Sequence, residues 1–170
     1  LVAAVRRALE RGQTPIVQAY ALGKAQEATK ILTSAGIPVL QEREIFNLSR
    51  VYESCGVSLG DHVQYPDYWR HGTAIVIPPS RHKATTLKKV KSPWMIACTG
   101  WALDADLSRR WGVDEAVALT DHADYGQLWT LIERVKPKKV FCFHGPDEFV
   151  DRLREQGVEA YSLYAPTTWK

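Results

Sequence analysis

Apolar positions along the chain recur with two different spacings. In some stretches they return every three or four residues, as at Val2, Val5 and Leu9, which is typical of a helix with one buried face. Between these stretches come short runs of apolar and β-branched residues, which are typical of buried strands. We predict helices over 1–11, 24–35, 42–54, 125–135 and 147–156. We predict strands over 15–20, 38–40, 73–77, 94–98, 115–119, 139–143 and 159–163.

Short strands that alternate with helices of ten to fifteen residues indicate right-handed crossovers and a largely parallel sheet. The uninterrupted apolar runs at 74–77 and 140–143 fit strands that are covered on both faces. The sequence therefore predicts the α/β class. The region 55–72 is expected to be a loop, and the stretch 103–111, where the alternation pauses, is the best candidate for a domain boundary.

Composition narrows the range of functions. The chain has 170 residues, of which 45% are apolar, and 22 Lys+Arg against 19 Asp+Glu leave a net charge of +3. It can therefore bury a core, and its mildly basic balance is compatible with an anionic partner without indicating a polybasic protein. Three widely spaced cysteines without a CxxC predict neither a disulfide framework nor a zinc ribbon, and they favour a reducing cytoplasm. The sequence contains no apolar run long enough to cross a membrane and no signal peptide.

Two histidines follow predicted strands. Thr120-Asp-His-Ala-Asp124 comes directly after one strand, and His144-Gly145 comes after the next. Because ligands gather at the carboxyl ends of parallel strands, we expect His122 and His144 to project from adjacent strand ends into one cleft. Asp121 and Asp124 could orient an imidazole. The alternative is that Thr120 or Asp121 only caps the helix and both histidines are partly exposed.

Two other strand ends carry small residues. Gly23 and Lys24 lie between a strand and a helix, where free backbone N–H groups and a cation suit a phosphate. Thr99 and Gly100 follow the strand at 94–98 and also fit a phosphodiester backbone, and Trp101 could stack on a base. Against this, a lone Gly-Lys is most often a turn with a solvated lysine.

A basic run extends from Arg81 to Lys91. It can be read as a surface that faces nucleic acid or as an ordinary solvated face. Cys98 and Cys142 lie within apolar strands and are expected to be small buried residues.

Four segments together resemble one family. They are Tyr-Ala-Leu-Gly-Lys-Ala-Gln-Glu at 20–27, Cys-Thr-Gly-Trp-Ala at 98–102, Thr-Asp-His-Ala-Asp-Tyr at 120–125 and Phe-His-Gly at 143–145. Their order and spacing resemble the C-terminal part of β-CASP metallo-β-lactamase-fold nucleases. The resemblance is strongest to the ligase-associated DNA exonuclease branch, which is also labelled as mRNA 3′-end processing exonucleases.

The resemblance implies a fold and a set of roles. It implies a Rossmann-like β-CASP domain over 1–103 and the C-terminal part of a metallo-β-lactamase αβ/βα fold over 104–170. His122 matches a histidine that assists the leaving group, with Asp121 and Asp124 beside it. His144 matches a ligand of one of two zinc ions. The implied activity is zinc-dependent hydrolysis of DNA or RNA, in DNA repair or RNA processing, with a DNA ligase as a suggested partner.

The chain departs from the family because it lacks the His-x-His-x-Asp-His signature, which would supply further metal ligands. We therefore expect it to be a fragment of a larger enzyme, inactive alone, weak in zinc binding, and missing the N-terminal half of the metallo-β-lactamase domain as a partner. Its last strands are then expected to expose an apolar face or edge and to self-associate.

Two other functions compete with the nuclease. One is a non-catalytic α/β module that binds nucleic acid or a protein through Lys24 and the basic run. The other, a nucleotide-binding Rossmann enzyme, is disfavoured because no G-x-G-x-x-G follows a strand.

Overall fold

The protein is described by a computed structural model, which describes residues 1–65, 71–81, 87, 89–104, 106–143 and 145–163. The chain forms two compact units, Leu1–His122 and Ala123–Lys170. Over the residues described, no helix is both long and apolar enough to span a bilayer.

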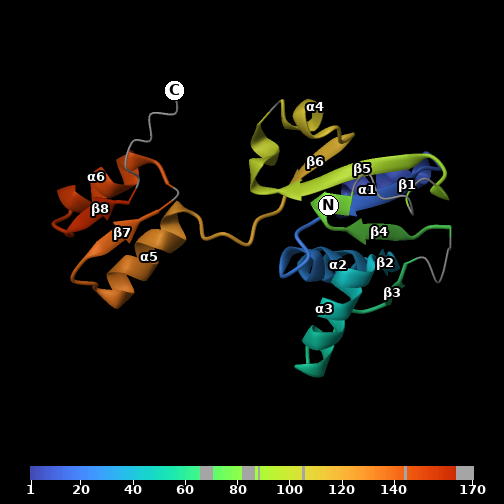
Figure 1. Ribbon diagram of the computed structural model, residues 1–170, viewed down its shortest axis with the longest axis horizontal. Coiled ribbons are helices and arrows are strands. Elements are labelled where there is room, and N and C mark those ends of the chain that lie inside the picture. Colours follow the sequence, from blue (N-terminus) through green and yellow to red (C-terminus); the bar gives the residue numbers. More distant parts are fainter. Residues whose placement is uncertain (66–70, 82–86, 88, 105, 144, 164–170) are drawn as a thin grey trace. The chain divides into compact units, whose positions relative to one another are not determined.

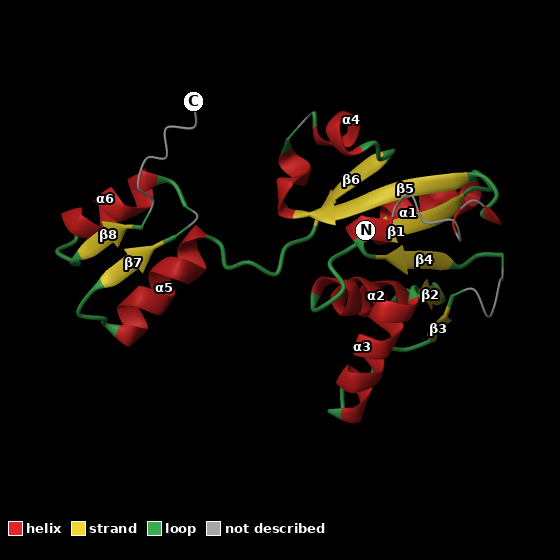
Figure 2. Cartoon of the chain, in the orientation of Figure 1, coloured by secondary structure: helices red, strands yellow, loops and turns green. Residues whose placement is uncertain are grey.

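The first unit is built on a six-stranded sheet in the order β3-β2-β4-β1-β5-β6, in which every neighbouring pair is parallel (Figures 1 and 2). The strands are β1 (Thr14–Gln18), β2 (Val39–Gln41), β3 (His62–Gln64), β4 (Ala74–Ile77), β5 (Pro93–Thr99) and β6 (Glu115–Ala118). All residues of β1 and β4 are buried, because both faces of these central strands are covered.

Three helices pack on one face of this sheet and supply part of the core. They are α1 (Val2–Glu10), α2 (Lys24–Ser34) and α3 (Arg43–Ser54). Their apolar residues pack on one face of the sheet in a single buried cluster that includes Val5, Leu32, Ile45, Val17, Val76 and Ile96. The helices form because their apolar residues recur at helical spacing and so give each helix one face to bury.

The other face of the sheet has a smaller core. Its buried residues alternate along the strands with those of the first cluster, and they are Ile16, Leu40, Ile75, Ile77 and Val90. Tyr65, Leu87 and Met95 pack against them. The remaining elements of the unit are the 3-10 helices η1 (Pro79–Arg81) and η3 (Gly100–Leu103) and the helix α4 (Leu107–Trp111).

The second unit is a small α/β layer. The strands β7 (Val140–Cys142) and β8 (Ala160–Ser162) pair in parallel, and the helices are α5 (Tyr125–Val135) and α6 (Asp147–Glu155). Val150, Leu153 and Ala160 form its buried centre. Trp129, Phe149 and Tyr125 add a cluster of aromatic rings, with centroids 5.6 to 6.4 Å apart.

The predicted α/β class with a parallel sheet is confirmed, and the predicted helices and strands agree with the observed ones to within about two residues at their ends. Among the described residues, one strand, one α-helix and the 3-10 helices η1 and η3 were not predicted. β3 lies in the region expected to be a loop, and α4 lies in the stretch expected to separate two domains.

The strands before His122 and His144 were expected to be neighbours, and this stays a prediction. Within the first unit β6 pairs with β5 at the edge of the six-stranded sheet, and within the second unit β7 pairs with β8. His144 itself lies outside the described residues, so the shared cleft stays a prediction.

The compact units divide after His122, while the expected boundary between family domains lies at 103/104. β6 continues the sheet of the first unit, and Arg7 of α1 forms an ion pair with Glu115 of β6. The assignment of 1–103 to a β-CASP domain and 104–170 to a metallo-β-lactamase domain stays a prediction.

Candidate functional site

The loops that follow β1, β5 and β6 leave the sheet at the same edge. Gln18 is in register with Ala97, and Thr99 is in register with Ala118, so the three neighbouring strands end close together. The carboxyl edge of a parallel sheet is where ligand sites form in this class of fold. Of the residues predicted for the site, this edge brings together Gly23, Lys24, Thr99, Gly100, Asp121 and His122.

A tight turn begins the loop after β1. Gly23 has φ 81° and ψ −75°, and the Lys24 N–H donates to the Leu22 carbonyl at 3.1 Å across it. This is a γ-turn with positive φ, a strained conformation that favours glycine. The Gln26 Oε1 accepts from the Gly23 N–H at 2.8 Å, and the Gln26 side-chain amide donates to Ser49 on α3. The start of α2 is therefore held in place by the Gly23 turn and by the hydrogen bonds of the Gln26 side chain.

Lys24 is buried at the start of α2, with only 2% of its side chain exposed. Its Nζ lies 3.2 Å from the Asp121 Oδ1 and 5.1 Å from the centroid of the Tyr20 ring. An ammonium group is costly to bury unless it is paired, and here a carboxylate and the face of an aromatic ring supply the compensation.

Asp121 connects the buried lysine to His122. Its side chain is 43% exposed, and its Oδ1 lies 3.9 Å from the His122 Nε2. Burial acts to raise the pKa of Asp121, but a backbone hydrogen bond, Lys24 and His122 together outweigh that effect and hold the pKa below its ordinary value. Asp121 is therefore a carboxylate at neutral pH.

His122 stands at the surface of the first unit. Its side chain is 85% exposed, and its backbone N–H donates to the Thr120 Oγ1 at 3.1 Å. The imidazole is therefore accessible to a ligand, while the backbone that carries it is held by a side chain of its own loop.

Thr99 and Gly100 lie beside this loop. Thr99 is buried and its Oγ1 accepts from the Trp101 N–H at 3.2 Å. A Cβ at position 100 would lie 3.4 Å from Thr120, an ordinary contact distance, so the ends of β5 and β6 lie side by side here. Trp101 is 71% exposed at this edge. The exposed ring matches the prediction of an accessible tryptophan, and base stacking stays a prediction.

Asp124 has a structural role, that of a helix cap, which was expected at Thr120 or Asp121. It is the N-cap of α5, where its carboxylate accepts from the Gln127 N–H at 2.8 Å and the Gln127 side chain accepts from the Asp124 N–H. The cap expected at Thr120 or Asp121 is therefore formed by Asp124, a residue of the second unit.

The predicted phosphate cradle at Gly23 and Lys24 differs from the structure. The N–H groups of Lys24, Ala25 and Glu27 already donate to backbone carbonyls, and that of Gly23 donates to Gln26. Lys24 is not a solvated lysine either, because its charge faces Asp121. The donors that were expected to be free are used by the turn itself.

No zinc ligand set is formed by the described residues, which contain no group of three or more His, Cys, Asp or Glu side chains suited to a metal. Asp121 and His122 supply two donors at most, and a catalytic zinc site needs three protein ligands. This part of the chain therefore does not fit a complete zinc site.

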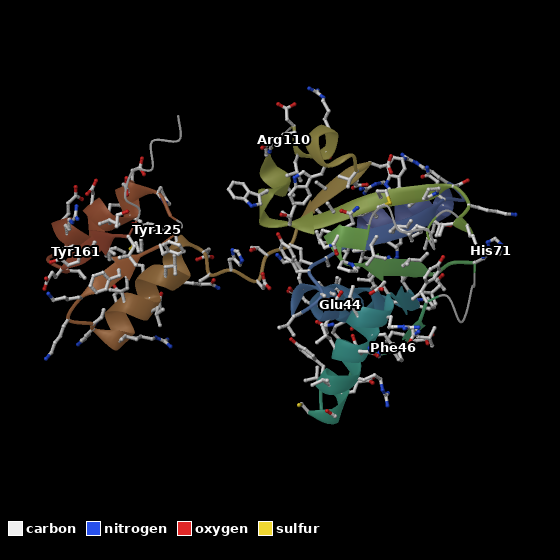
Figure 3. The ribbon with its side chains drawn as sticks, viewed as in Figure 1. Glu44, Phe46, His71, Arg110, Tyr125 and Tyr161 are labelled. Carbon is white, nitrogen blue, oxygen red and sulfur yellow. The ribbon has the colours of Figure 1, made fainter. Side chains whose placement is uncertain are left out.

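A cavity of about 630 Å³ lies at the other edge of the sheet, where β1, β4 and β5 begin. Its lining includes His71, which is labelled in Figure 3, and Lys89 and Lys91. Lys89 and Lys91 are the described lysines of the basic run. Residues 82–86 and 88 of that run, among them Lys83 and Lys88, lie outside the described residues.

The second unit exposes an apolar sheet face. Phe141, Tyr161 and Leu163 lie on the side of β7 and β8 away from the buried centre of this unit, and each is at least 40% exposed; Tyr161 is labelled in Figure 3. Helix α5 has no buried residue and adds an exposed apolar stripe of Leu128, Leu131 and Val135. Within the unit taken by itself the apolar face is exposed, while its exposure in the whole chain and self-association stay predictions.

Comparison with known proteins places part of this site in a described domain. Residues 113–166 match the family described as the Zn-dependent metallo-hydrolase RNA specificity domain, RMMBL. A protein of Opitutus terrae named "Probable DNA ligase" is 32% identical over 150 residues, which is 88% of this chain and 15% of that protein. The first match supports a Zn-dependent metallo-hydrolase family for this segment.

The RMMBL segment contains Asp121, His122, Asp124 and His144. Gly23, Lys24, Thr99 and Gly100 come from outside it, on loops that lie next to Asp121 and Thr120. The match points to a Zn-dependent hydrolase family, and its description suggests binding of nucleic acid.

Proposed function

We propose that this chain is part of a zinc-dependent nuclease that hydrolyses phosphodiester bonds of DNA or RNA. One observation carries the proposal: the RMMBL segment presents His122 at the carboxyl edge of a parallel sheet, with an ionised carboxylate beside it. An accessible imidazole next to a carboxylate is suited to proton transfer.

The four predicted residues of the RMMBL segment have roles in this proposal. His122 protonates the departing oxygen, Asp121 orients its imidazole, and Asp124 holds the start of α5 close by in the chain. His144 would ligate one of two zinc ions, and the further ligands would come from outside the described residues. We assign no step to zinc, because the described residues do not form its ligand set.

The proposal extends to partners. The chain spans 15% of the length of the curated relative that it matches. We propose that the exposed face formed by Phe141, Tyr161 and Leu163 packs against the rest of a metallo-β-lactamase domain, because burying apolar surface of this kind is favourable. The name of the relative supports a functional partnership with a DNA ligase. We propose that the activity is that of an exonuclease or an RNA-processing nuclease and that it takes place in the cytoplasm.

The test compares two histidine variants in the full-length protein that contains this chain. His144→Ala is expected to remove zinc, whereas His122→Ala retains zinc and slows turnover by about 10²- to 10⁴-fold, the usual contribution of a positioned proton donor. Lys30→Ala, at an exposed residue of α2 outside both candidate sites, is the control. Zinc content and nuclease rate are measured for each variant. Equal zinc loss in the His122 and His144 variants would show that these roles are wrongly divided.

The second candidate is a nucleic-acid-binding module without catalysis. The cavity lined by His71, Lys89 and Lys91 favours it, because clustered cations are suited to a phosphate backbone. A Lys89→Glu/Lys91→Glu variant of the chain then loses oligonucleotide affinity while His122→Ala does not, which filter binding or fluorescence anisotropy measures. The opposite pattern favours the carboxyl edge.

A further inference from the structure

We propose that Lys24 is a positioning residue that holds Asp121, and through it His122, at the edge of the sheet. The inference rests on the proposed function for the catalytic role of His122, while the arrangement itself is a property of the structure. It replaces the phosphate-binding role predicted for Lys24 with an indirect one, in which the lysine acts through a carboxylate.

Burial indicates that the ammonium group of Lys24 has a fixed partner. The side chain is 2% exposed, and a lysine so deeply buried is stable only when its charge is paired. Asp121 is the carboxylate at 3.2 Å, and the Tyr20 ring lies across the ammonium at 5.1 Å. A phosphate group would have to displace one of these contacts and bring its own negative charge beside the carboxylate of Asp121.

The lysine is well placed to act as a fixed point. It is the first residue of α2, and the Gly23 turn and the Gln26 side chain hold the backbone on which it stands. Gln26 in turn donates to the Ser49 hydroxyl on α3, so the anchor extends into the core of the unit. Asp121, by contrast, stands on a loop and is partly exposed. The pair therefore joins a rigid element to a loop that carries a proposed catalytic group.

One carboxylate oxygen contacts both neighbours. The Asp121 Oδ1 lies 3.2 Å from the Lys24 Nζ and 3.9 Å from the His122 Nε2. An ion pair on a buried lysine limits the rotamers of the aspartate. At 3.9 Å the carboxylate is not hydrogen-bonded to the imidazole, and it acts on the orientation of the ring by electrostatic attraction when His122 is protonated. Because the His122 side chain is 85% exposed, few other groups restrict its orientation.

The two members of the pair differ in what their removal leaves behind. Lys24→Met leaves a partly exposed carboxylate that water can solvate. Asp121→Asn leaves a buried ammonium without its counter-charge, which is the costlier defect. We therefore expect Asp121→Asn to lower the urea midpoint of the chain more than Lys24→Met does.

The first experiment uses the chain itself and follows the His122 imidazole by ¹H–¹³C NMR. Lys24→Met is expected to move these ring resonances. Asp121→Asn is also expected to move them, and the double variant is expected to show no change in the resonances beyond that of Asp121→Asn alone. Lys24→Arg keeps a cation and is expected to restore the original positions in part. Lys30→Met is the matched control, since Lys30 is an exposed lysine on the same helix. If Lys24→Met does not fold, Lys24→Gln takes its place.

The second experiment measures turnover in the full-length protein. Lys24→Met is expected to lower kcat by up to about 100-fold, the cost of a misplaced catalytic group, with KM and zinc content unchanged and with partial rescue by Lys24→Arg. His122 resonances that do not respond to Lys24→Met would overturn the inference. Resonances that respond while His122→Ala keeps full activity would uphold the positioning and refute the proposed function instead.

Discussion

Replacing Gly23 with alanine is expected to destabilise the first unit through its backbone. Gly23 adopts φ 81° and ψ −75°, which side-chain-bearing residues rarely occupy. A Cβ at this position would lie 3.4 Å from the Asp121 Oδ2, which is an ordinary contact distance. The cost therefore comes from the dihedral angles, and holding a residue in such a region costs about 1–3 kcal/mol.

A matched control separates this effect from the general loss of a glycine. Gly112, after α4, has φ 63° and ψ 40°, the left-handed helical conformation, with open space where a Cβ would be. Asparagine tolerates that conformation and does not tolerate the turn at Gly23. We expect Gly112→Asn to cost less than about 1 kcal/mol, and Gly23→Asn to cost as much as Gly23→Ala.

Urea denaturation followed by far-UV circular dichroism measures the difference. With a slope of about 1–3 kcal/mol per M, a loss of about 2 kcal/mol lowers the midpoint by roughly 1 M. The Gly23 variants are also expected to move the His122 ring resonances, since Lys24 directly follows the turn. Gly23→Asn and Gly112→Asn with equal midpoints would refute the strained-turn explanation.

Three further predictions concern a thiol, a carboxylate and the apolar face. Burial raises the pKa of Cys98 to about 12, so at pH 8 Cys98 is expected to react with iodoacetamide far more slowly than the exposed Cys55, and equal labelling by mass spectrometry would contradict this. The pKa of Asp121 is lowered in the folded state, so its stabilisation is present above the unfolded value near about 3.9 and is lost as pH falls through the folded value. Asp121→Asn should therefore flatten the fall of the urea midpoint below about pH 4, and an unchanged pH profile would refute it. Sedimentation velocity should show self-association of the chain, reduced by Phe141→Lys/Leu163→Lys; a monomeric parent chain would refute the role of this face.

Local pattern determined most of the secondary structure. The helix predicted over 125–135 is α5, Tyr125–Val135, and the one over 24–35 is α2, Lys24–Ser34. These elements are readable because helical spacing and strand runs are set by which face each residue must bury. β3 has three residues and a mixed burial pattern, so nothing in its local sequence marks it as a strand. It becomes one only because β2 offers it a partner.

Sheet membership was decided by the tertiary structure. The runs that became β6 and β7 read as strands in the sequence, but the local pattern does not say which strand each one pairs with. Within its own unit β6 pairs with β5, and β7 pairs with β8. Strand pairing is a long-range choice among backbones with equivalent hydrogen-bonding groups, and the local pattern does not encode the partner.

In the candidate site, too, some features were determined by the local sequence and others by the tertiary structure. The sequence by itself determined that Gly23, Lys24, Thr99 and Asp121 follow strands, because strand ends and turn residues are local signals. Only the tertiary structure decided that Lys24 is buried and paired with Asp121, because the order β1-β5-β6 brings loops from distant parts of the chain to one edge. A lysine at a strand end looks the same in sequence whether it faces water or a carboxylate. Its environment is set by the elements that fold around it.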